Sequence, residues 1–160
     1  MKQLESRKVT IGENNFYIRP LPAFKAANMG GELAGMLAPI FAGLVPLAGV
    51  VGEDKGLFDI EIEDAAPALS NAFSSLSGDK LEKLLKHLLV GGGNISIEAP
   101  GEKAQLLTED LANEVFCEDV QDMFILAFEV IRTNYNGFFK KLGGPFGQLM
   151  EGLMKKGSLR

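Results

Sequence analysis

The sequence predicts a mainly α-helical domain of the α+β class, in which a helical body surrounds a long C-terminal helix and a short β-hairpin lies at the N-terminus. Apolar residues recur at helical spacing over residues 116–142, which is the longest such run in the chain. Shorter helical patterns occupy residues 65–90 and 108–116, whereas alternating apolar and polar residues are confined to brief runs. Helices therefore outweigh strands in the expected architecture.

The composition indicates one domain with its own hydrophobic core. The chain has 160 residues, 46% of them hydrophobic, and a net charge of −5 with no basic stripe, which argues against a nucleic-acid-binding protein. A single cysteine, Cys117, excludes an internal disulfide framework and fits a reducing cytoplasm, and the charged N-terminal residues lack the apolar centre of a signal peptide. We expect one domain over residues 1–160, divided into a hairpin (1–20), a helical body (21–142) and a short amphipathic tail (143–160).

The expected long helix covers residues 116–142. Acidic residues fill its first turns and lysines its last, as the helix dipole favours. Ile125, Leu126 and Val130 lie outside its main apolar arc, so its middle should be buried on two sides. The pattern leaves open whether Thr108–Leu142 is one helix or two. The main arc consists of Phe116, Val120, Met123, Phe124, Ala127, Phe128, Ile131, Tyr135, Phe138, Phe139 and Leu142.

Three short segments have the alternation of β-strands. Val9–Ile11 and Phe16–Arg19 flank the turn-forming residues Gly12–Asn15, which predicts a β-hairpin. Residues 58–62 and 94–98 are further strand candidates on the same grounds.

The remaining helices have recognisable start signals. Asp64 is expected to cap a helix over residues 65–76, and Ser77 a second helix over residues 78–90 that carries one stripe of leucines. Thr108, followed by two acids, opens a short helix that ends near Phe116.

Residues 33–52 form a stretch of twenty residues without a charge, after a helix expected at residues 23–32. Its length alone would permit a transmembrane helix, but Pro39 and Pro46 interrupt it and its flanks are acidic. Large apolar residues recur on one side and small residues on the other. We expect a helix that is buried or faces a protein client, with membrane insertion as the alternative.

No residue set predicts catalysis, a cofactor or a metal site. His87 is the only histidine, and we expect it at the solvated surface. Cys117 precedes two acids, which disfavours a reactive thiolate, and the glycines at Gly91–Gly93 and Gly143–Gly147 lack the GK[ST] ending of a phosphate-binding loop. The sequence therefore indicates a protein that is not an enzyme and that binds other proteins through apolar surface.

Three segments, read in order, resemble a known family. They are FYIRPLPAFKAANMGGELAGMLAP (16–39), DAAPALSNAFSSLSGDKLEKLLKHLL (64–89) and LTEDLANEVFCEDVQDMFILAFEVIRTNYNGFFKKLG (107–143). Together they are similar to the tail assembly chaperones of long-tailed, siphovirus-type phages and prophages of Firmicutes. The likeness covers most of the chain, although no single motif in it is diagnostic.

The resemblance implies a non-enzymatic role in phage tail assembly. Such a chaperone binds the apolar, helical tape measure protein, keeps it soluble and helps the tail tube protein polymerise. It acts in the cytoplasm of the bacterial host and is absent from the mature virion, and many members have a longer form made by ribosomal frameshifting. The sequence also allows homo-oligomers. The alternatives are a structural component of the tail and a small membrane-active phage protein that inserts residues 33–51.

The family supplies no binding motif that transfers residue by residue, so contact residues are inferred from apolar pattern alone. The uncharged stretch and the C-terminal tail combine large apolar residues with helix breakers, which fits a movable binding element. The expected contacts to the tape measure protein are Met36, Leu37, Ile40, Phe41, Leu44, Phe146, Leu149, Met150 and Leu153.

Overall fold

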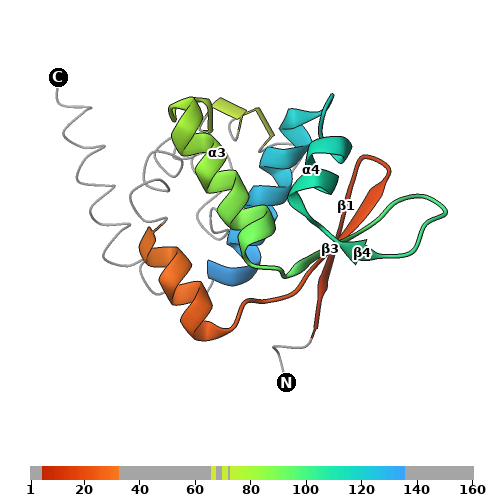
Figure 1. Ribbon diagram of the computed structural model, residues 1–160, viewed down its shortest axis with the longest axis horizontal. Coiled ribbons are helices and arrows are strands. Elements are labelled where there is room, and N and C mark those ends of the chain that lie inside the picture. The colour runs from red at the N-terminus through yellow and green to blue at the C-terminus, as the bar shows by residue number, and fades with distance from the viewer. Residues whose placement is uncertain (1–4, 33–65, 68–69, 72, 136–160) are drawn as a thin grey trace, which may run out of the picture.

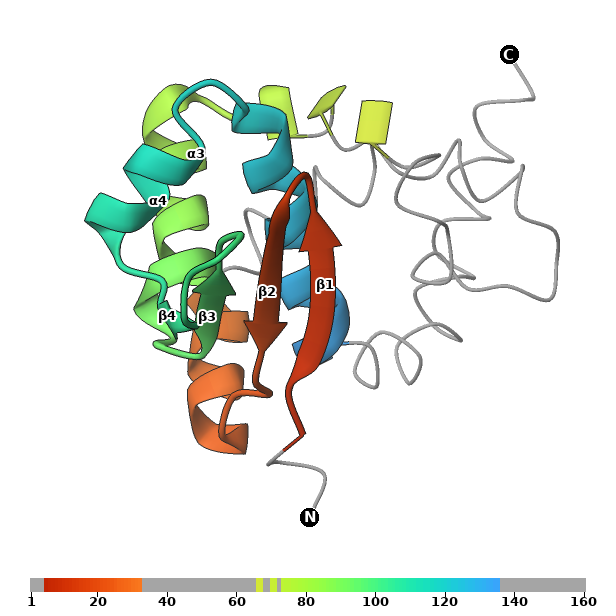
Figure 2. The same ribbon diagram turned by 90° about the vertical axis from the view of Figure 1, so that its right-hand side faces the viewer.

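The described part of the molecule is a four-stranded antiparallel sheet packed against helices, as Figure 1 and Figure 2 show. The computed structural model describes residues 5–32, 66–67, 70–71 and 73–135. The strands lie in the order β1 (Arg7–Ile11), β2 (Asn14–Ile18), β3 (Ile95–Glu98) and β4 (Gln105–Leu106). The helices are residues 23–32, α3 (Gly78–Lys86) with its π-helical continuation η3 (His87–Gly91), α4 (Glu109–Val115) and residues 120–135. The mainly α class with an N-terminal hairpin is confirmed.

The N-terminal hairpin has a tighter turn than the sequence predicts. Its loop is the pair Gly12-Glu13, because Ile11 already pairs with Asn14 across the two strands. Gly12 has a φ of 60°, and a glycine at the first central position is what a type II′ turn requires. The expected turn residues Asn14 and Asn15 are therefore part of β2.

One face of the sheet is apolar and the other is polar. Val9, Phe16 and Ile97 lie next to one another across three strands, and all three are buried. On the opposite face, the hydroxyl of Tyr17 donates a hydrogen bond to Glu98, and Lys8 lies 5.9 Å from the centre of the Tyr17 ring. The strand period of two explains this division, and it assigns the apolar face to the helices.

The long C-terminal helix does not begin at Phe116. α4 ends at Val115, residues 116–119 form a turn, and helix resumes at residue 120. The turn allows the Phe116 ring to stack on Phe16 of β2, with 5.8 Å between ring centres. Val120, which the periodicity assigned to the buried arc, lies in the first turn after the break and is 50% exposed. The structure thus resolves the open question: 108–135 contains two helices.

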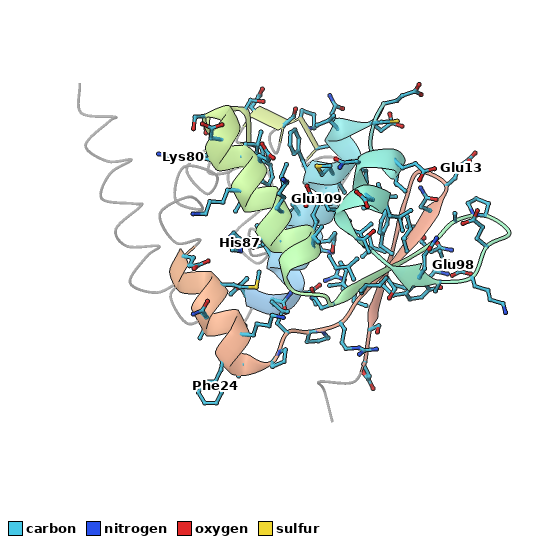
Figure 3. All side chains as sticks on the ribbon, viewed as in Figure 1. Glu13, Phe24, Lys80, His87, Glu98 and Glu109 are labelled. Carbon is cyan, nitrogen blue, oxygen red and sulfur yellow. The ribbon has the colours of Figure 1, made fainter. Side chains whose placement is uncertain are left out.

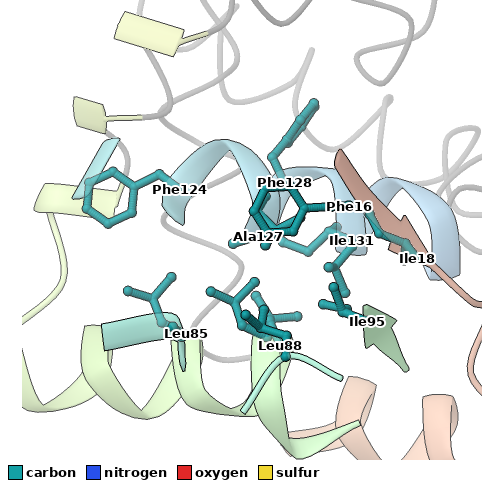
Figure 4. Close-up of a cluster of buried hydrophobic side chains, with 14 of the residues drawn as sticks. Phe16, Ile18, Leu85, Leu88, Ile95, Phe124, Ala127, Phe128 and Ile131 are labelled. Atoms are coloured by element: carbon teal, nitrogen blue, oxygen red, sulfur yellow. The ribbon is translucent and has the colours of Figure 1, made fainter. Parts of the chain in front are cut away.

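Helix 120–135 is the centre of the core. Its residues from Leu126 to Ile131 are all buried, so the predicted burial on two sides is confirmed. Figure 4 shows Leu85, Leu88 and Ile95 on one side of this helix, and Phe16 and Ile18 extending toward it from β2. Phe124 also stacks on Phe73, with ring centres 5.0 Å apart.

The last described turn of helix 120–135 holds the segment that leads into helix 23–32. The side-chain oxygen of Asn134 accepts a hydrogen bond from the backbone N–H of Leu21 at 2.7 Å. The hydroxyl of Tyr135 donates to the carbonyl of Ala26 at 2.9 Å. These two contacts fix where the chain leaves the sheet.

Several local predictions are confirmed and others lie outside the described residues. Thr108 caps α4 by accepting from the N–H of Leu111 at 3.3 Å, and Ser77 precedes α3 as expected, although its side chain makes no capping bond. The strand candidate 58–62, the uncharged stretch 33–52 and the tail 143–160 fall on residues that the structure does not describe. The division of the chain into three parts stays a prediction. None of the helices within the described ranges is long and apolar enough to cross a membrane.

Candidate protein-binding groove

The nine residues predicted to contact the tape measure protein all lie outside the described part of the chain. They are Met36, Leu37, Ile40, Phe41, Leu44, Phe146, Leu149, Met150 and Leu153. Their role therefore remains a prediction, and the site described below is a different one.

A groove runs between α3 and α4, which lie side by side in Figure 1. Its volume is about 380 Å³, and its floor and walls are mainly apolar. Leu85 and Leu89 are buried at its base, whereas Leu81 and Met123 are only partly buried. The residues that line the groove are Gly78, Leu81, Glu82, Leu85, Lys86, Leu89, Val90, Glu109, Ala112, Asn113 and Met123.

Lys86 links the two helices at the rim of this groove. Its Nζ lies 2.8 Å from Oε1 of Glu82 on the same helix and 2.9 Å from Oε1 of Glu109 at the start of α4. Figure 3 places Glu109 between the ribbons of α3 and α4. The hydrogen bonds that Lys86 donates to the two carboxylates raise its pKa, and its ammonium lowers the pKa of Glu82. All three side chains are at least 48% exposed, so water weakens both ion pairs. Another charged group can therefore replace one of the partners at low cost.

A second, more open depression adjoins the groove across Lys86. It has a volume of about 480 Å³ and is lined by charged residues of α3, such as Asp79 and Lys83, together with His87. Glu82, Lys86 and Glu109 border both hollows. Fewer of the residues that line the groove are charged than of those that line the depression.

His87 is not the freely solvated residue that the sequence predicts. Its Nε2 lies 3.4 Å from Oε2 of Glu32, and its side chain is 33% exposed. It therefore joins Glu32, the last described residue of helix 23–32, to η3, the π-helical turn that begins at His87 (Figure 3). Single π-helical turns often occur at functional sites, and this one borders both hollows through Val90.

Glu129 is a buried carboxylate that sequence reasoning missed. Its side chain has no exposed area, and it lies 3.2 Å from Nη2 of Arg7 and 3.1 Å from Nη2 of Arg132. Neither carboxylate oxygen accepts a well-directed hydrogen bond within the described residues, so the contacts are mainly charge pairing. Burial raises the pKa of Glu129, although the two guanidinium groups act in the opposite direction.

The alternation of β1 could have signalled this contact. Arg7 falls on the same face as Val9 and Ile11, which are buried toward the helices. A cation at that position needs an anionic partner inside the molecule. The sequence does not show which of the many carboxylates would be that partner.

The described residues offer little other chemistry. No group of three or more His, Cys, Asp or Glu side chains that could hold a metal ion occurs among them, and Cys117 is exposed. Three large apolar side chains stand out from the surface, but they lie on separate elements: Phe24 (93% exposed), Leu106 (53%) and Val120 (50%). In Figure 3 Phe24 points away from the body of the molecule.

Comparison with known proteins gives one match. A family model described as phage tail assembly chaperone protein, TAC, matches residues 12–147, which is most of the chain. Neither the curated proteins nor the solved structures contain a match. A match over this length begins at the hairpin turn and covers β2, the uncharged stretch and every described helix. The chain belongs to the phage tail assembly chaperone family.

Proposed function

We propose that this protein binds an apolar helical segment of a phage tape measure protein, keeps it soluble and promotes assembly of the tail tube around it. The role is that of a chaperone, and it needs no catalysis, cofactor or metal. The observation that carries the proposal is the family match, which covers residues 12–147 and so includes the uncharged stretch 33–52.

The described core supports this assignment of the contact surface. Phe16, Phe73 and Phe128 are fully or almost fully buried, as are most large apolar residues of the described segments. Those residues are occupied in holding the fold together and are not available to a client. The sequence of the uncharged stretch and of the tail contains further large apolar residues, and the proposal assigns these to the client.

The proposal includes the wider setting of tail assembly. The partners are the tape measure protein and the tail tube protein, with self-association and a longer frameshifted form as further features. The protein acts in the cytoplasm of a Firmicutes host during assembly of a siphovirus-type tail and is absent from the finished particle. Separating infected cells into particle, soluble and membrane pools tests this. Recovery in the particle indicates a structural tail component, and recovery in the membrane pool indicates insertion of residues 33–51.

Co-purification tests the client contact directly. The full chain is co-expressed with the tape measure protein encoded by the same phage, and the amount of client retained is measured. Phe41→Asp and Leu153→Asp should each reduce retention strongly, because a charge in an apolar contact is costly to desolvate. Phe24→Asp is the matched control for Phe41→Asp, since it makes the same aromatic-to-acid change at a position that is 93% exposed.

The readout distinguishes a contact surface from a core. If residues 33–51 and the tail face the client, both test variants keep the helical circular dichroism and melting temperature of the wild type while losing the client. If they are core, the variants lose their fold instead. Folded variants that retain the tape measure protein as well as Phe24→Asp does would disprove the proposed surface.

A further inference from the structure

We propose that the groove between α3 and α4 binds an amphipathic helix whose apolar stripe is flanked by lysine or arginine. The residues that line this groove are different from residues 33–51 and the tail, to which the proposed function assigns the tape measure contact. The two proposals can therefore fail independently.

The shape of the groove fits one face of a helix. Leu85 and Leu89 form a base, while Leu81 and Met123 are partly buried and retain surface toward the opening. Its volume of about 380 Å³ accommodates a few apolar side chains rather than a whole domain. A helix meets such a groove with residues at i, i+3, i+4 and i+7, which is a recurrent mode of peptide recognition.

The charge of the α4 wall determines the chemistry of the partner. Glu109 is the one charged residue that α4 contributes to the lining of the groove. Asp110 and Glu114 are exposed on the same helix but do not line the groove, and α4 has no basic residue. In the sequence, no lysine or arginine occurs between Lys103 and Arg132. A helix seated against this wall is favoured by basic side chains on the flank that faces α4 and disfavoured by acidic ones.

Lys86 shows how a cation is held at this rim. One ammonium lies between the carboxylates of Glu82 and Glu109, so the trio carries a net negative charge. An incoming lysine or arginine can pair with Glu109 while Lys86 keeps Glu82. Because all three groups are well exposed, this exchange of partners requires no buried charge.

The test uses three model peptides with the full-length protein. The first has leucines at helical spacing and lysines elsewhere, the second replaces the lysines by glutamates, and the third has the composition of the first in scrambled order. Fluorescence anisotropy of labelled peptides gives the affinities. We expect the leucine–lysine peptide to bind at least about tenfold more tightly than either of the others, which corresponds to about 1.4 kcal/mol.

Matched protein variants locate the binding. Glu109→Lys reverses a charge at the groove, and Glu13→Lys makes the same reversal at the exposed hairpin turn. Both change the net charge equally, so nonspecific attraction falls equally in both. Glu109→Lys should weaken binding of the leucine–lysine peptide by about tenfold or more, whereas Glu13→Lys should change it by less than about threefold.

Other outcomes overturn the proposal. Equal binding of the scrambled peptide, or equal effects of the two variants, means that the groove has no specific helix site. Tighter peptide binding by the tail variant Leu153→Asp means that residues 143–160 of the same chain occupy the groove. Dissociation of an oligomer by the peptide, measured by light scattering, means that a second copy is the occupant.

Discussion

Arg7 and Glu129 connect the first strand to the centre of the core: Nη2 of Arg7 lies 3.2 Å from Oε2 of a carboxylate that has no exposed area. Arg132, one turn further along the helix, pairs with the other carboxylate oxygen at 3.1 Å. A buried charge is tolerated only when it is paired, and these two cations supply the pairing. Since Arg7 is 39% exposed, its side of the contact is partly screened by water.

The raised pKa of Glu129 predicts a pH-dependent stability. The folded protein binds a proton at Glu129 more tightly than the unfolded chain does, because burial outweighs the two arginines. The resulting stabilisation is fully present below the ordinary pKa of a glutamate and is lost as pH rises through the raised pKa. Glu129→Gln removes this contribution. The free energy of unfolding of the wild type, minus that of Glu129→Gln, should therefore decrease as pH rises.

Urea unfolding of both proteins at a series of pH values measures this difference. Circular dichroism and tyrosine fluorescence should give the same transition, which verifies two-state unfolding at each pH. A difference that grows with pH would show that the arginines outweigh burial at the Glu129 carboxyl, and a constant difference would show that the two effects cancel. Either result would contradict the prediction.

Gly92 and Gly31 form a contrasting pair of glycines. A Cβ on Gly92 would lie 2.4 Å from Oδ1 of Asn94 and 2.9 Å from Cδ2 of Leu21. Asn94 cannot easily move aside, because its Nδ2 donates to the carbonyl of Arg19 at 2.7 Å. Gly92→Ala should therefore destabilise the protein by about 1–3 kcal/mol, as overpacking usually does.

At Gly31 the same substitution should have the opposite effect. A Cβ there meets nothing within 4 Å, and the residue lies in helix 23–32. Gly31→Ala should raise the free energy of unfolding by about 0.5–1 kcal/mol through the lower entropy of the unfolded chain. Chemical denaturation of both variants measures the two changes in the free energy of unfolding. If the two changes are equal, the close approach at Gly92 is relieved by a backbone shift.

Local signals in the sequence predicted much of the fold. The leucine stripe of α3, the Thr108 cap and the alternation around Gly12 each depend on neighbours within a few residues. β4 was missed, because Gln105 and Leu106 are both exposed and two residues carry no pattern. The break at residues 116–119 was left open, since the stacking of Phe116 on Phe16 is a contact between distant segments.

The candidate site was less predictable for the same reason. The groove exists only because α3 and α4 lie side by side, and the pairing of Lys86 with Glu109 joins two elements that are separated by β3 and β4. Periodicity identifies which face of each helix is apolar but not which helix covers it. Similarly, nothing in the sequence distinguishes Glu129 from an acidic residue on the surface of a helix. Only its distances to Arg7 and Arg132 identify it as a buried, paired carboxylate.

Asn134 should contribute to stability through two hydrogen bonds of its side chain. Its Oδ1 accepts from the N–H of Leu21 at 2.7 Å, and its Nδ2 donates to the carbonyl of Val130 at 2.9 Å, so the side chain is held in place at both ends. Asn134→Ala leaves the partly buried Leu21 N–H without this acceptor and should cost about 1–3 kcal/mol. Asn134→Asp keeps an acceptor for that N–H and should cost less.

Thr133→Ala is the matched control for Asn134→Ala. The Thr133 hydroxyl donates only to the carbonyl of Glu129 one turn earlier, at 2.8 Å, so its loss strands no amide and should change stability by less than about 0.5 kcal/mol. Hydrogen exchange of the Leu21 amide adds a local measurement, because this amide should exchange faster in Asn134→Ala than in Thr133→Ala. Unchanged protection of Leu21 together with unchanged stability would show that water replaces the Asn134 side chain without cost. In that case the hydrogen bond would not be what positions the segment between the sheet and helix 23–32.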